Sequence, residues 1–440
     1  MMKQLAAVFA AGCLVACGGG GADGNADDAD AGVDGGNAEP GEDAGIDAPT
    51  DPGPLGRVLY PLDRRHSPIT PEVVQRLSTM AAAPRANQVF MKVGDSITFA
   101  DEFLRCFDGG TVNLADRAAL QPTIHHYLGG SIDDATPFMR ASFSAYNGAT
   151  SASLLEGSPS KLARELTASS ARVGVTMIGT NDVRRGRSLD DLVTDLWTIV
   201  DAQLAAGTIP LLSSIPANSN DAWADVQIPR WNLAIRGLAQ GRQVPFMDLH
   251  RALSPLPNRG LSSDGVHPSV APAGACVWTS DALQYGYNMR NLVTIESLAR
   301  VRAALAGTAS DASATMLSGE GTAAAPHVVP YPFADLGDTR TGEALASTHG
   351  CGSMRANPGR EVVYTIDLPA QVRLHAQVID RGATDVDLHV IQGGDCKGAG
   401  DSSVVVTVGP GPVTIVVDTP AEANEGEFLL VLGPRVNPPA

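Results

Sequence analysis

The chain has 440 residues, 44% of them hydrophobic, and a formal net charge of −17 at pH 7. Residues 18–56 contain eight Asp, two Glu and no basic residue, so they supply ten of the seventeen excess negative charges. The rest of the chain is therefore only mildly acidic, which argues against a nucleic-acid partner and gives no sign for the charge of a substrate.

The N-terminus predicts an export signal in residues 1–16. A basic start precedes an almost uncharged run that is too short to cross a bilayer as a stable helix. The sequence Leu14-Val15-Ala16-Cys17 resembles the bacterial lipobox, which implies that Cys17 carries a lipid and holds the exported protein at a membrane surface of the bacterial cell envelope. The alternative is an ordinary cleaved signal, with Cys17 left free or removed.

Residues 17–56 predict a disordered, acidic tether. They consist of Gly, Ala, Asp, Asn and Pro with isolated Glu and almost no large apolar side chain. Such a segment buries too little apolar surface to offset the entropy of ordering it, and its like charges extend it.

Helical and strand patterns alternate through residues 57–306. The strand segments are continuous apolar runs, which are typical of parallel strands buried on both faces. We therefore predict a three-layer α/β/α domain. The predicted helices cover residues 71–82, 158–169, 188–206, 225–241 and 281–306, and the predicted strands cover residues 89–93, 140–146, 173–178, 209–215 and 245–249.

The C-terminal part has a different pattern. Residues 307–330 predict a linker, because Ala, Ser, Thr and Gly predominate there. In residues 331–440, short runs rich in β-branched residues recur between Gly, Pro, Asp and Asn, which predicts a small antiparallel β-sandwich. This region resembles the bacterial pre-peptidase C-terminal type of domain. Its predicted strands cover residues 361–368, 372–379, 386–391, 404–408, 413–417 and 428–432.

Four cysteines follow the signal region: Cys106, Cys276, Cys351 and Cys396. An exported protein meets oxidising conditions, so disulfide pairing is expected, although the sequence leaves three connectivities open. We favour Cys106 with Cys276 and Cys351 with Cys396, because each pair stays inside one predicted domain.

Ser96 lies where a predicted strand breaks at a glycine and a helix begins, which is the edge where open α/β sheets place their ligands. A serine hydroxyl needs a histidine to take its proton and a carboxylate to orient that histidine. Asp264 and His267 lie three residues apart in one loop and supply both groups. The N–H groups of Ser96 and Gly148 and the Asn181 amide are candidates for an oxyanion hole.

Taken one at a time, these residues have ordinary structural explanations. Ser96 and Asn181 suit helix caps, Asp264-Gly265 is a turn dipeptide, and His267 could be a surface loop residue. Glycine after a strand is also common in turns, so Gly148 has competitors in the nearby glycines. Those competitors are Gly129, Gly130 and Gly157.

In combination, four motifs resemble the ordered blocks of the SGNH/GDSL hydrolase superfamily, whereas the Gly-x-Ser-x-Gly signature of α/β-hydrolases is missing from the nucleophile. The resemblance covers residues 85–305 and implies a flavodoxin-like fold. It also implies Ser96 as nucleophile, His267 as general base and acid, Asp264 as its orienting group, and Ser96, Gly148 and Asn181 as oxyanion hole. The motifs are Gly94-Asp95-Ser96-Ile97-Thr98, Gly148, Gly179-Thr180-Asn181-Asp182 and Asp264-Gly265-Val266-His267-Pro268.

We expect no metal and no organic cofactor. The pair His125-His126 has no evident partner ligands, and we interpret it as part of a loop. A calcium site at Asp380, Asp385 and Asp387 is the alternative in the sandwich, but Asp385-Val386-Asp387-Leu388 is ordinary inside/outside alternation.

The resulting hypothesis is a monomeric, surface-anchored serine esterase acting on lipid esters or O-acetylated glycans. A cluster at Arg184, Arg185 and Arg187 could meet an anionic substrate, or be a solvated basic loop. A non-catalytic adhesion or carbohydrate-binding lipoprotein, which uses the hydrolase fold as a scaffold, is the alternative.

Overall fold

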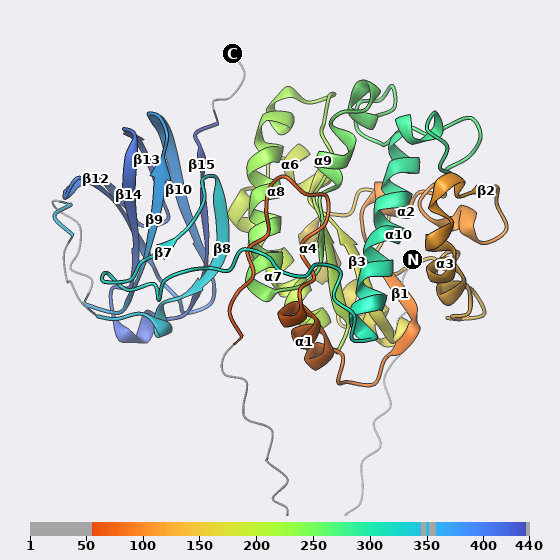
Figure 1. Cartoon of the computed structure of the whole chain (residues 1–440), viewed down its shortest axis with the longest axis horizontal. Helices are drawn as coiled ribbons and strands as arrows, with labels where there is room; N and C mark the ends of the chain where they lie inside the picture. Colours follow the sequence, from red (N-terminus) through yellow and green to blue (C-terminus); the bar gives the residue numbers. More distant parts are fainter. Residues whose placement is uncertain (1–54, 345–348, 352–357, 437–440) are drawn as a thin grey trace, which may run out of the picture. The chain divides into compact units, whose positions relative to one another are not determined.

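The computed structural model describes residues 55–344, 349–351 and 358–436, as Figure 1 shows. The predicted export signal, Cys17 and nearly all of the predicted tether lie outside these residues. Among the helices that are described, none combines the length and the apolar character that a membrane span requires.

A four-stranded parallel sheet forms the centre of the N-terminal domain. Its strands are β1 (Ala86–Gly94), β3 (Ala171–Met177), β4 (Ile209–Ser213) and β5 (Phe246–Met247), in the order β1-β3-β4-β5. Every residue of β3, β4 and β5 is buried, as expected for parallel strands covered on both faces. The predicted α/β class is therefore confirmed.

Helices pack on this sheet in two groups. The first group, in which α10 contacts the other three, comprises α1 (Pro71–Met80), α3 (Gln121–Leu128), α9 (Leu249–Leu253) and α10 (Gly286–Leu305). The second comprises α4 (Ser151–Leu155), α5 (Lys161–Ser169), α7 (Leu189–Ala205) and α8 (Ala222–Arg242). Two short helices, α2 (Ser96–Phe99) and α6 (Thr180–Arg184), begin directly after β1 and β3.

Two predictions about this domain are wrong. Residues 140–146 do not form a regular strand; they make turns and touch β1 through a single parallel bridge between Gly94 and Ala145. The pair His125-His126 lies in helix α3 instead of a loop, where the His126 ring contacts the Asn87 carbonyl oxygen at 2.9 Å. Pro122 in the first turn of α3 favours the helix start, a signal that the sequence contains.

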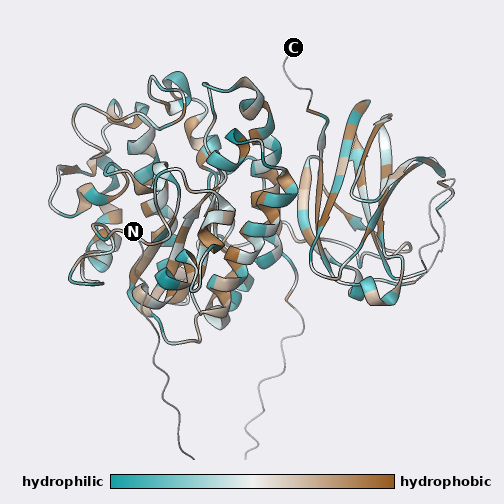
Figure 2. Ribbon diagram, turned by 180° about the vertical axis from the view of Figure 1, so that it is seen from behind, coloured by the Kyte–Doolittle hydropathy of each residue, from teal (hydrophilic) through white to brown (hydrophobic). Residues whose placement is uncertain are grey.

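The C-terminal domain is a sandwich of two antiparallel sheets, as predicted. Figure 2 shows apolar residues along its strands, and these side chains form a separate core between the sheets. One sheet has the order β13-β10-β15-β8, with β8 (Phe333–Asp338), β10 (Val372–Asp380), β13 (Ser403–Val408) and β15 (Glu427–Pro434). The other has the order β12-β11-β14-β9-β7, with β7 (His327–Val328) joining in parallel and β9 (Glu361–Leu368), β11 (Asp387–Gln392), β12 (Asp395–Gly400) and β14 (Gly411–Asp418).

Strand β8 packs directly on helix α8 of the parallel-sheet domain. A Cβ atom placed on Gly237 would lie 2.6 Å from the Ala334 Cβ, and one on Gly241 would lie 2.4 Å from the Leu336 Cβ. Only glycine therefore permits this approach of helix to strand. The side chain of Arg242 adds an ion pair to Glu427 on β15 at 2.5 Å.

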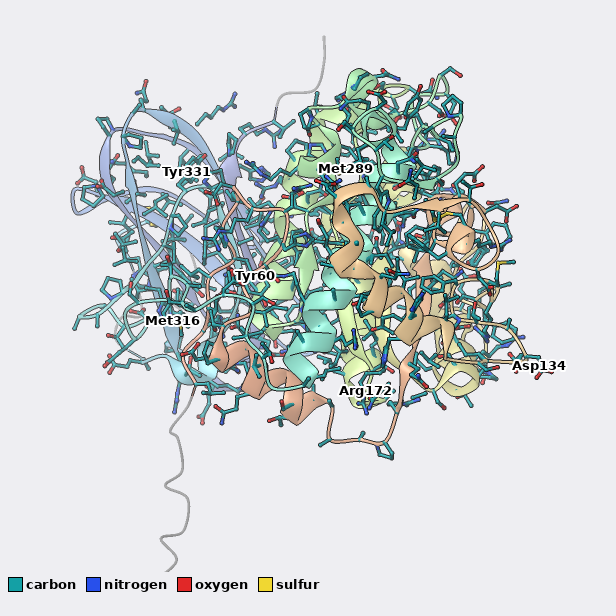
Figure 3. All side chains as sticks on the ribbon, turned by 45° about the vertical axis from the view of Figure 1, so that its right-hand side comes forward. Tyr60, Asp134, Arg172, Met289, Met316 and Tyr331 are labelled. Carbon is teal, nitrogen blue, oxygen red and sulfur yellow. A yellow bond between two sulfur atoms is a disulfide. The ribbon has the colours of Figure 1, made fainter. Side chains whose placement is uncertain are left out.

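The segment that precedes α1 touches both domains. The Val58 N–H donates to the Gln243 side chain at 2.9 Å, and the Leu59 N–H donates to Thr315 at 2.8 Å. Arg57 pairs with the buried Asp335 of β8 at 2.6 Å. Tyr60, labelled in Figure 3, is buried and donates its hydroxyl to Val244. The predicted linker is consequently held by backbone hydrogen bonds around residues 315–317.

Candidate active site

The serine predicted as nucleophile occupies the first turn of α2. Strand β1 ends at Gly94, and Asp95 caps the helix by accepting the Ile97 N–H at 3.0 Å. Ser96 is half-buried. Because it opens the helix, its N–H has no partner inside α2, and it donates to no other described residue. The turn thus presents both a hydroxyl and a free N–H at the carboxyl edge of the sheet.

Ser96, His267 and Asp264 form a continuous chain of hydrogen bonds. The Ser96 Oγ lies 2.8 Å from His267 Nε2, and His267 Nδ1 lies 2.6 Å from Asp264 Oδ2. The side chains of His267 and Asp264 are 39% and 50% exposed, so the chain opens to solvent. This is the geometry in which an imidazole can take a serine proton while a carboxylate fixes the opposite ring nitrogen.

The other oxygen of Asp264 is held by its own loop. Asp264 Oδ1 accepts from the Val266 N–H at 2.9 Å, the His267 N–H at 3.0 Å and the Ser262 hydroxyl at 2.8 Å. Desolvation raises the pKa of Asp264, but these bonds and the His267 ring lower it more, so the pKa lies well below its usual value. The carboxylate therefore stays ionised and fixed in orientation beneath the imidazole.

The predicted oxyanion donors lie beside this turn. The bridge from Gly94 to Ala145 places the segment leading to Gly148 next to the end of β1, and the Asn181 amide donates to the Ala149 carbonyl at 3.0 Å. No described residue accepts a hydrogen bond from the Gly148 N–H. Gly148 and Asn181 are thus brought together, with one amide N–H of Asn181 left to serve a ligand.

Gly148 also has a conformation that favours glycine. Its φ is +76°, and a Cβ built there would meet only the Arg185 Nη2, at 3.4 Å. The competing glycines lie in other surroundings: Gly130 follows α3 and packs against the Gln88 backbone, and Gly157 sits in a turn bridged to Ser160. Of the candidates weighed, Gly148 is the one adjoining the Ser96 turn.

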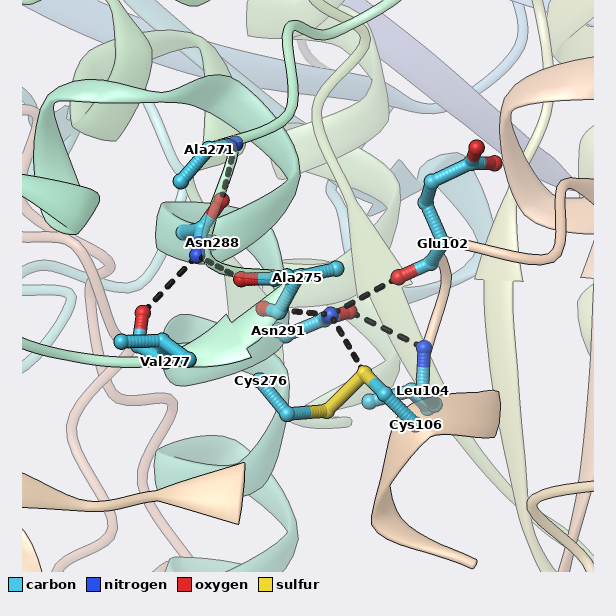
Figure 4. The surroundings of a disulfide bond; sticks show 10 residues. Glu102, Leu104, Cys106, Ala271, Ala275, Cys276, Val277, Asn288 and Asn291 are labelled. Atoms are coloured by element: carbon cyan, nitrogen blue, oxygen red, sulfur yellow. Dashed lines mark hydrogen bonds between the residues drawn. A yellow bond between two sulfur atoms is a disulfide. The ribbon is translucent and has the colours of Figure 1, made fainter. Parts of the chain in front are cut away.

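Helix α10 and a disulfide hold together the segments that follow Ser96 and His267 (Figure 4). The Asn291 side chain accepts from the Leu104 N–H and donates to the Glu102 and Ala275 carbonyl oxygens. The disulfide joins Cys106 to Cys276, as favoured from the sequence, and the other predicted disulfide, Cys351–Cys396, is also present. Beside the first, β2 (Val112–Asn113) pairs in parallel with β6 (Cys276–Val277).

Two buried charged side chains, Arg290 and Asp95, lie beside the nucleophile turn. The fully buried Arg290 of α10 donates to the Ile97 carbonyl and, at 2.8 Å, to the Thr98 hydroxyl, and its guanidinium stacks on Phe103. Desolvation lowers the pKa of Arg290 to about 10 and raises the pKa of Asp95 to about 6. Arg290 therefore fixes the carbonyl end of α2, while Asp95 fixes its N–H end.

The three arginines that follow Asn181 have different surroundings. Arg187 pairs with Asp182 and Asp195, both at 2.8 Å, so it organises the α6 turn. Arg185 donates to the Gly148 carbonyl at 2.9 Å, and Arg184 is exposed. Only Arg184 and Arg185 remain placed to approach a bound molecule.

Sequence reasoning missed Arg290, Asn288 and Asn291 as positioning residues, and it took Asp95 only as part of a motif. A signal was present: these three α10 residues interrupt a helix otherwise predicted to be anchored by apolar side chains. A polar residue on a buried helix face requires a partner, and here the partners are the loops that carry the site.

The parallel-sheet domain is similar to a known family. Residues 93–272 match the family described as GDSL-like Lipase/Acylhydrolase. The match does not extend to the sandwich, so its resemblance to pre-peptidase C-terminal domains stays a prediction. Among curated proteins, none matches the chain.

Several solved structures are similar to about half of the chain. A GDSL-like lipase from Bacteroides thetaiotaomicron is 16% identical, with 52% of this chain and 98% of that one covered and a TM-score of 0.33. An acetylxylan esterase from Geobacillus stearothermophilus is 17% identical over 50% and 96%, with a TM-score of 0.35. A carbohydrate esterase of family 3 from Talaromyces cellulolyticus is 21% identical over 48% and 97%, with a TM-score of 0.32.

The raised pKa of Asp95 predicts how stability depends on pH. The pKa of Asp95 is near 4 in the unfolded chain and about 6 in the folded protein, so between these pH values the folded protein binds the Asp95 proton more tightly than the unfolded chain does. Wild-type stability should therefore fall as the pH rises through this window, and Asp95→Asn should lack that fall. Relative to wild type, the variant should gain on the order of 1–3 kcal/mol in free energy of unfolding between pH 4 and pH 7, measured by urea denaturation.

Asp101→Asn is the matched control, because that side chain is 81% exposed. It should follow the wild-type curve. An Asp95→Asn variant that loses stability relative to wild type as the pH rises would contradict the assignment of a costly buried charge.

Proposed function

We propose that this protein is a serine esterase that forms an acyl-enzyme at Ser96. The observation that carries the proposal is the chain of two hydrogen bonds from Ser96 Oγ to His267 Nε2 and from His267 Nδ1 to Asp264 Oδ2. The match to an acylhydrolase family supports the same reaction class. The alternative of a non-catalytic binding protein is not favoured, because a scaffold has no need of this arrangement.

In the first half-reaction, Ser96 Oγ attacks the ester carbonyl carbon while His267 Nε2 takes the hydroxyl proton. Asp264 keeps the other ring proton on Nδ1 and stabilises the imidazolium that forms. The negative charge on the former carbonyl oxygen is met by the N–H groups of Ser96 and Gly148 and by the Asn181 amide. Collapse of this intermediate breaks the ester C–O bond, and His267 gives its proton to the departing alcohol.

In the second half-reaction, water replaces the alcohol. His267 Nε2, now neutral, takes a proton from a water molecule that attacks the acyl carbon bound to Ser96. The same donors stabilise the second tetrahedral intermediate. As this intermediate collapses and the bond from the acyl carbon to Ser96 Oγ breaks, His267 gives its proton to Ser96 Oγ, which releases the acid and restores the hydroxyl. The partial exposure of His267 supports this step, because water must reach the ring.

The surroundings of Asn181 favour a polar leaving group over a lipid. A pocket of about 650 Å³ begins at Asn181 and is lined by polar and charged side chains together with Trp223, which is 41% exposed. An exposed indole face with nearby amides and guanidinium groups suits a sugar ring and its hydroxyls. We therefore favour O-acylated glycans as substrate. The lining residues are Asn181, Arg184, Arg185, Asn220, Asp221, Ala222 and Trp223.

A larger cavity of about 1030 Å³ is not assigned to the substrate. Its lining includes Pro229, Arg230 and Met289, and none of Ser96, Asn181 and His267 borders it. The smaller pocket is lined by Asn181, one of the proposed oxyanion donors, so it carries the proposal for the leaving group despite its size.

The proposed setting is the surface of a bacterial cell envelope. The export signal predicted in residues 1–16 and the lipobox-like sequence ending at Cys17 support a lipid-anchored enzyme. The tether predicted for residues 17–56 would hold the catalytic domain off the membrane within reach of envelope glycans.

Substitutions at the triad give the first test of the proposal. Wild-type residues 57–440 should hydrolyse p-nitrophenyl acetate, whereas Ser96→Ala and His267→Ala should lower kcat by about 10⁴-fold or more, because each removes part of one catalytic unit. Asn181→Ala should lower kcat by about 10²- to 10³-fold with little change in KM.

His126→Ala serves as the control, since that histidine lies in α3 and bonds the Asn87 carbonyl. It should keep wild-type activity. Equal, negligible turnover by all variants and wild type, with no labelling of Ser96 by a fluorophosphonate, would refute the esterase proposal.

The substrate class is tested at Trp223. We expect Trp223→Ala to raise KM for acetylated xylo-oligosaccharides by about 3- to 10-fold, through lost stacking on the sugar, and to leave p-nitrophenyl acetate hydrolysis unchanged. Val328→Ala, at an exposed residue of the sandwich, should change neither value. Faster hydrolysis of long-chain nitrophenyl esters than of acetate would instead favour lipid esters.

The anchoring proposal is tested at Cys17. Full-length protein expressed in a bacterium should incorporate labelled palmitate and sediment with membranes, and Cys17→Ala should lose both properties while keeping esterase activity. Cys13→Ala is the matched control and should behave as wild type. Membrane association that persists in Cys17→Ala would exclude a lipid at this position.

A further inference from the structure

A second cluster of reactive side chains lies in the sandwich, outside the catalytic domain. The neighbouring strands β9, β14 and β11 bring Glu361, Asp418 and His389 to one end of the five-stranded sheet, with Glu361 directly opposite Asp418 in register. Their neighbours in sequence, Val362, Val417 and Leu388, face the core between the sheets. Because side chains alternate along a strand, the three polar side chains face the outer side of the sheet.

These side chains are nevertheless buried. Those of Glu361, His389 and Asp418 are between 0% and 3% exposed, and that of His349 is 9% exposed. The rings of His349 and His389 lie with their centroids 4.6 Å apart. His349 stands two residues before Cys351, which the disulfide to Cys396 joins to strand β12. Three groups that bind cations, on His349, His389 and Asp418, thus converge in a site shielded from water, and Glu361 lies beside His349.

The donor atoms have the spacing of metal ligands. His349 Nε2 lies 3.2 Å from Glu361 Oε2 and 3.1 Å from Asp418 Oδ2, and His389 Nε2 lies 3.1 Å from Asp418 Oδ2. In a tetrahedral zinc site with bonds of 2.0–2.2 Å, neighbouring donors are about 3.3–3.6 Å apart. The observed separations fall just short of this range, so a small shift would admit the ion.

The imidazole of His389 gives an independent reason to look for a ligand. It is buried, and neither ring nitrogen makes a hydrogen bond within the described part of the chain. His349 Nε2 and Glu361 Oε2 also lack hydrogen-bonding geometry despite their close contacts. Buried polar atoms left in this state are costly, and a shared cation would satisfy several of them at once.

We propose that His349, His389 and Asp418 form a structural binding site for Zn²⁺ or a similar divalent transition metal, with Glu361 beside His349. Two imidazoles and a carboxylate are a donor set suited to zinc, and a shift of Glu361 would complete the tetrahedron. The ion would hold the His349 segment on the sheet and, because it lies in the sandwich, would take no part in ester hydrolysis. The alternative is a metal-free ion-pair cluster: Asp418, followed by Glu361, raises the pKa of His349 to about 9.

Metal binding by the untagged full chain distinguishes these possibilities. Protein stripped with a chelator and titrated with Zn²⁺ in a calorimeter should bind one equivalent, and its Tm should rise. Substitution by Co²⁺ should give the absorption of a tetrahedral complex. His389→Ala and His349→Ala should each lose the stoichiometric binding and the Tm shift while keeping esterase activity.

His375→Ala is the matched control, since His375 lies on β10 of the other sheet. It should bind one equivalent as wild type does. Circular dichroism establishes that each variant is folded. If His389→Ala fails to fold, His349→Ala still tests the proposal, because His349 lies outside the strands. Wild-type protein that takes up no Zn²⁺ or Co²⁺, or variants that bind as wild type does, would overturn the proposal.

Discussion

The catalytic geometry depends on one hydrogen bond between Ser96 and His267, whose residues lie 171 positions apart in the sequence. Neither residue lies within a strand, so other elements must hold the α2 turn and the loop that contains His267. Helix α10 does this with buried polar side chains: Arg290 binds the α2 backbone after Ser96, and Asn288 binds the loop that follows His267. The Cys106–Cys276 disulfide adds a covalent tie between the same segments.

This arrangement explains why so many polar groups are buried around the site. Arg290 is fully buried, and no ion pair joins it to a carboxylate among the described residues, so its guanidinium is costly to desolvate. Its bonds to the Ile97 carbonyl and Thr98 hydroxyl satisfy part of that cost and keep α2 in place. The buried Arg290 guanidinium thus lowers the stability of the fold but keeps the nucleophile turn in place, as preorganised catalysis requires.

The sequence predicted which residues follow the ends of the strands, but it did not predict the side chains that hold those strand ends in place. Ser96 and Asn181 follow strong apolar runs, so their positions at the sheet edge were predictable. Residues 140–146 alternate as a strand does, yet they form turns in which the Ser142 and Ser144 hydroxyls donate to the Lys92 carbonyl of β1. Strand β8 was missed, since its apolar residues face α8 and the sandwich core together and follow no simple alternation.

The close packing of Gly237 and Gly241 against β8 has a consequence for how this protein could have evolved. Sandwich domains are often regarded as interchangeable modules, joined by linkers that tolerate exchange. Here a replacement domain would need a strand that packs against the α8 backbone as closely as β8 packs against Gly237 and Gly241. It would also need a carboxylate in the place of Asp335 to pair with Arg57. The two domains are therefore better regarded as one inherited unit, in which changes on either side of the α8–β8 contact must be matched on the other.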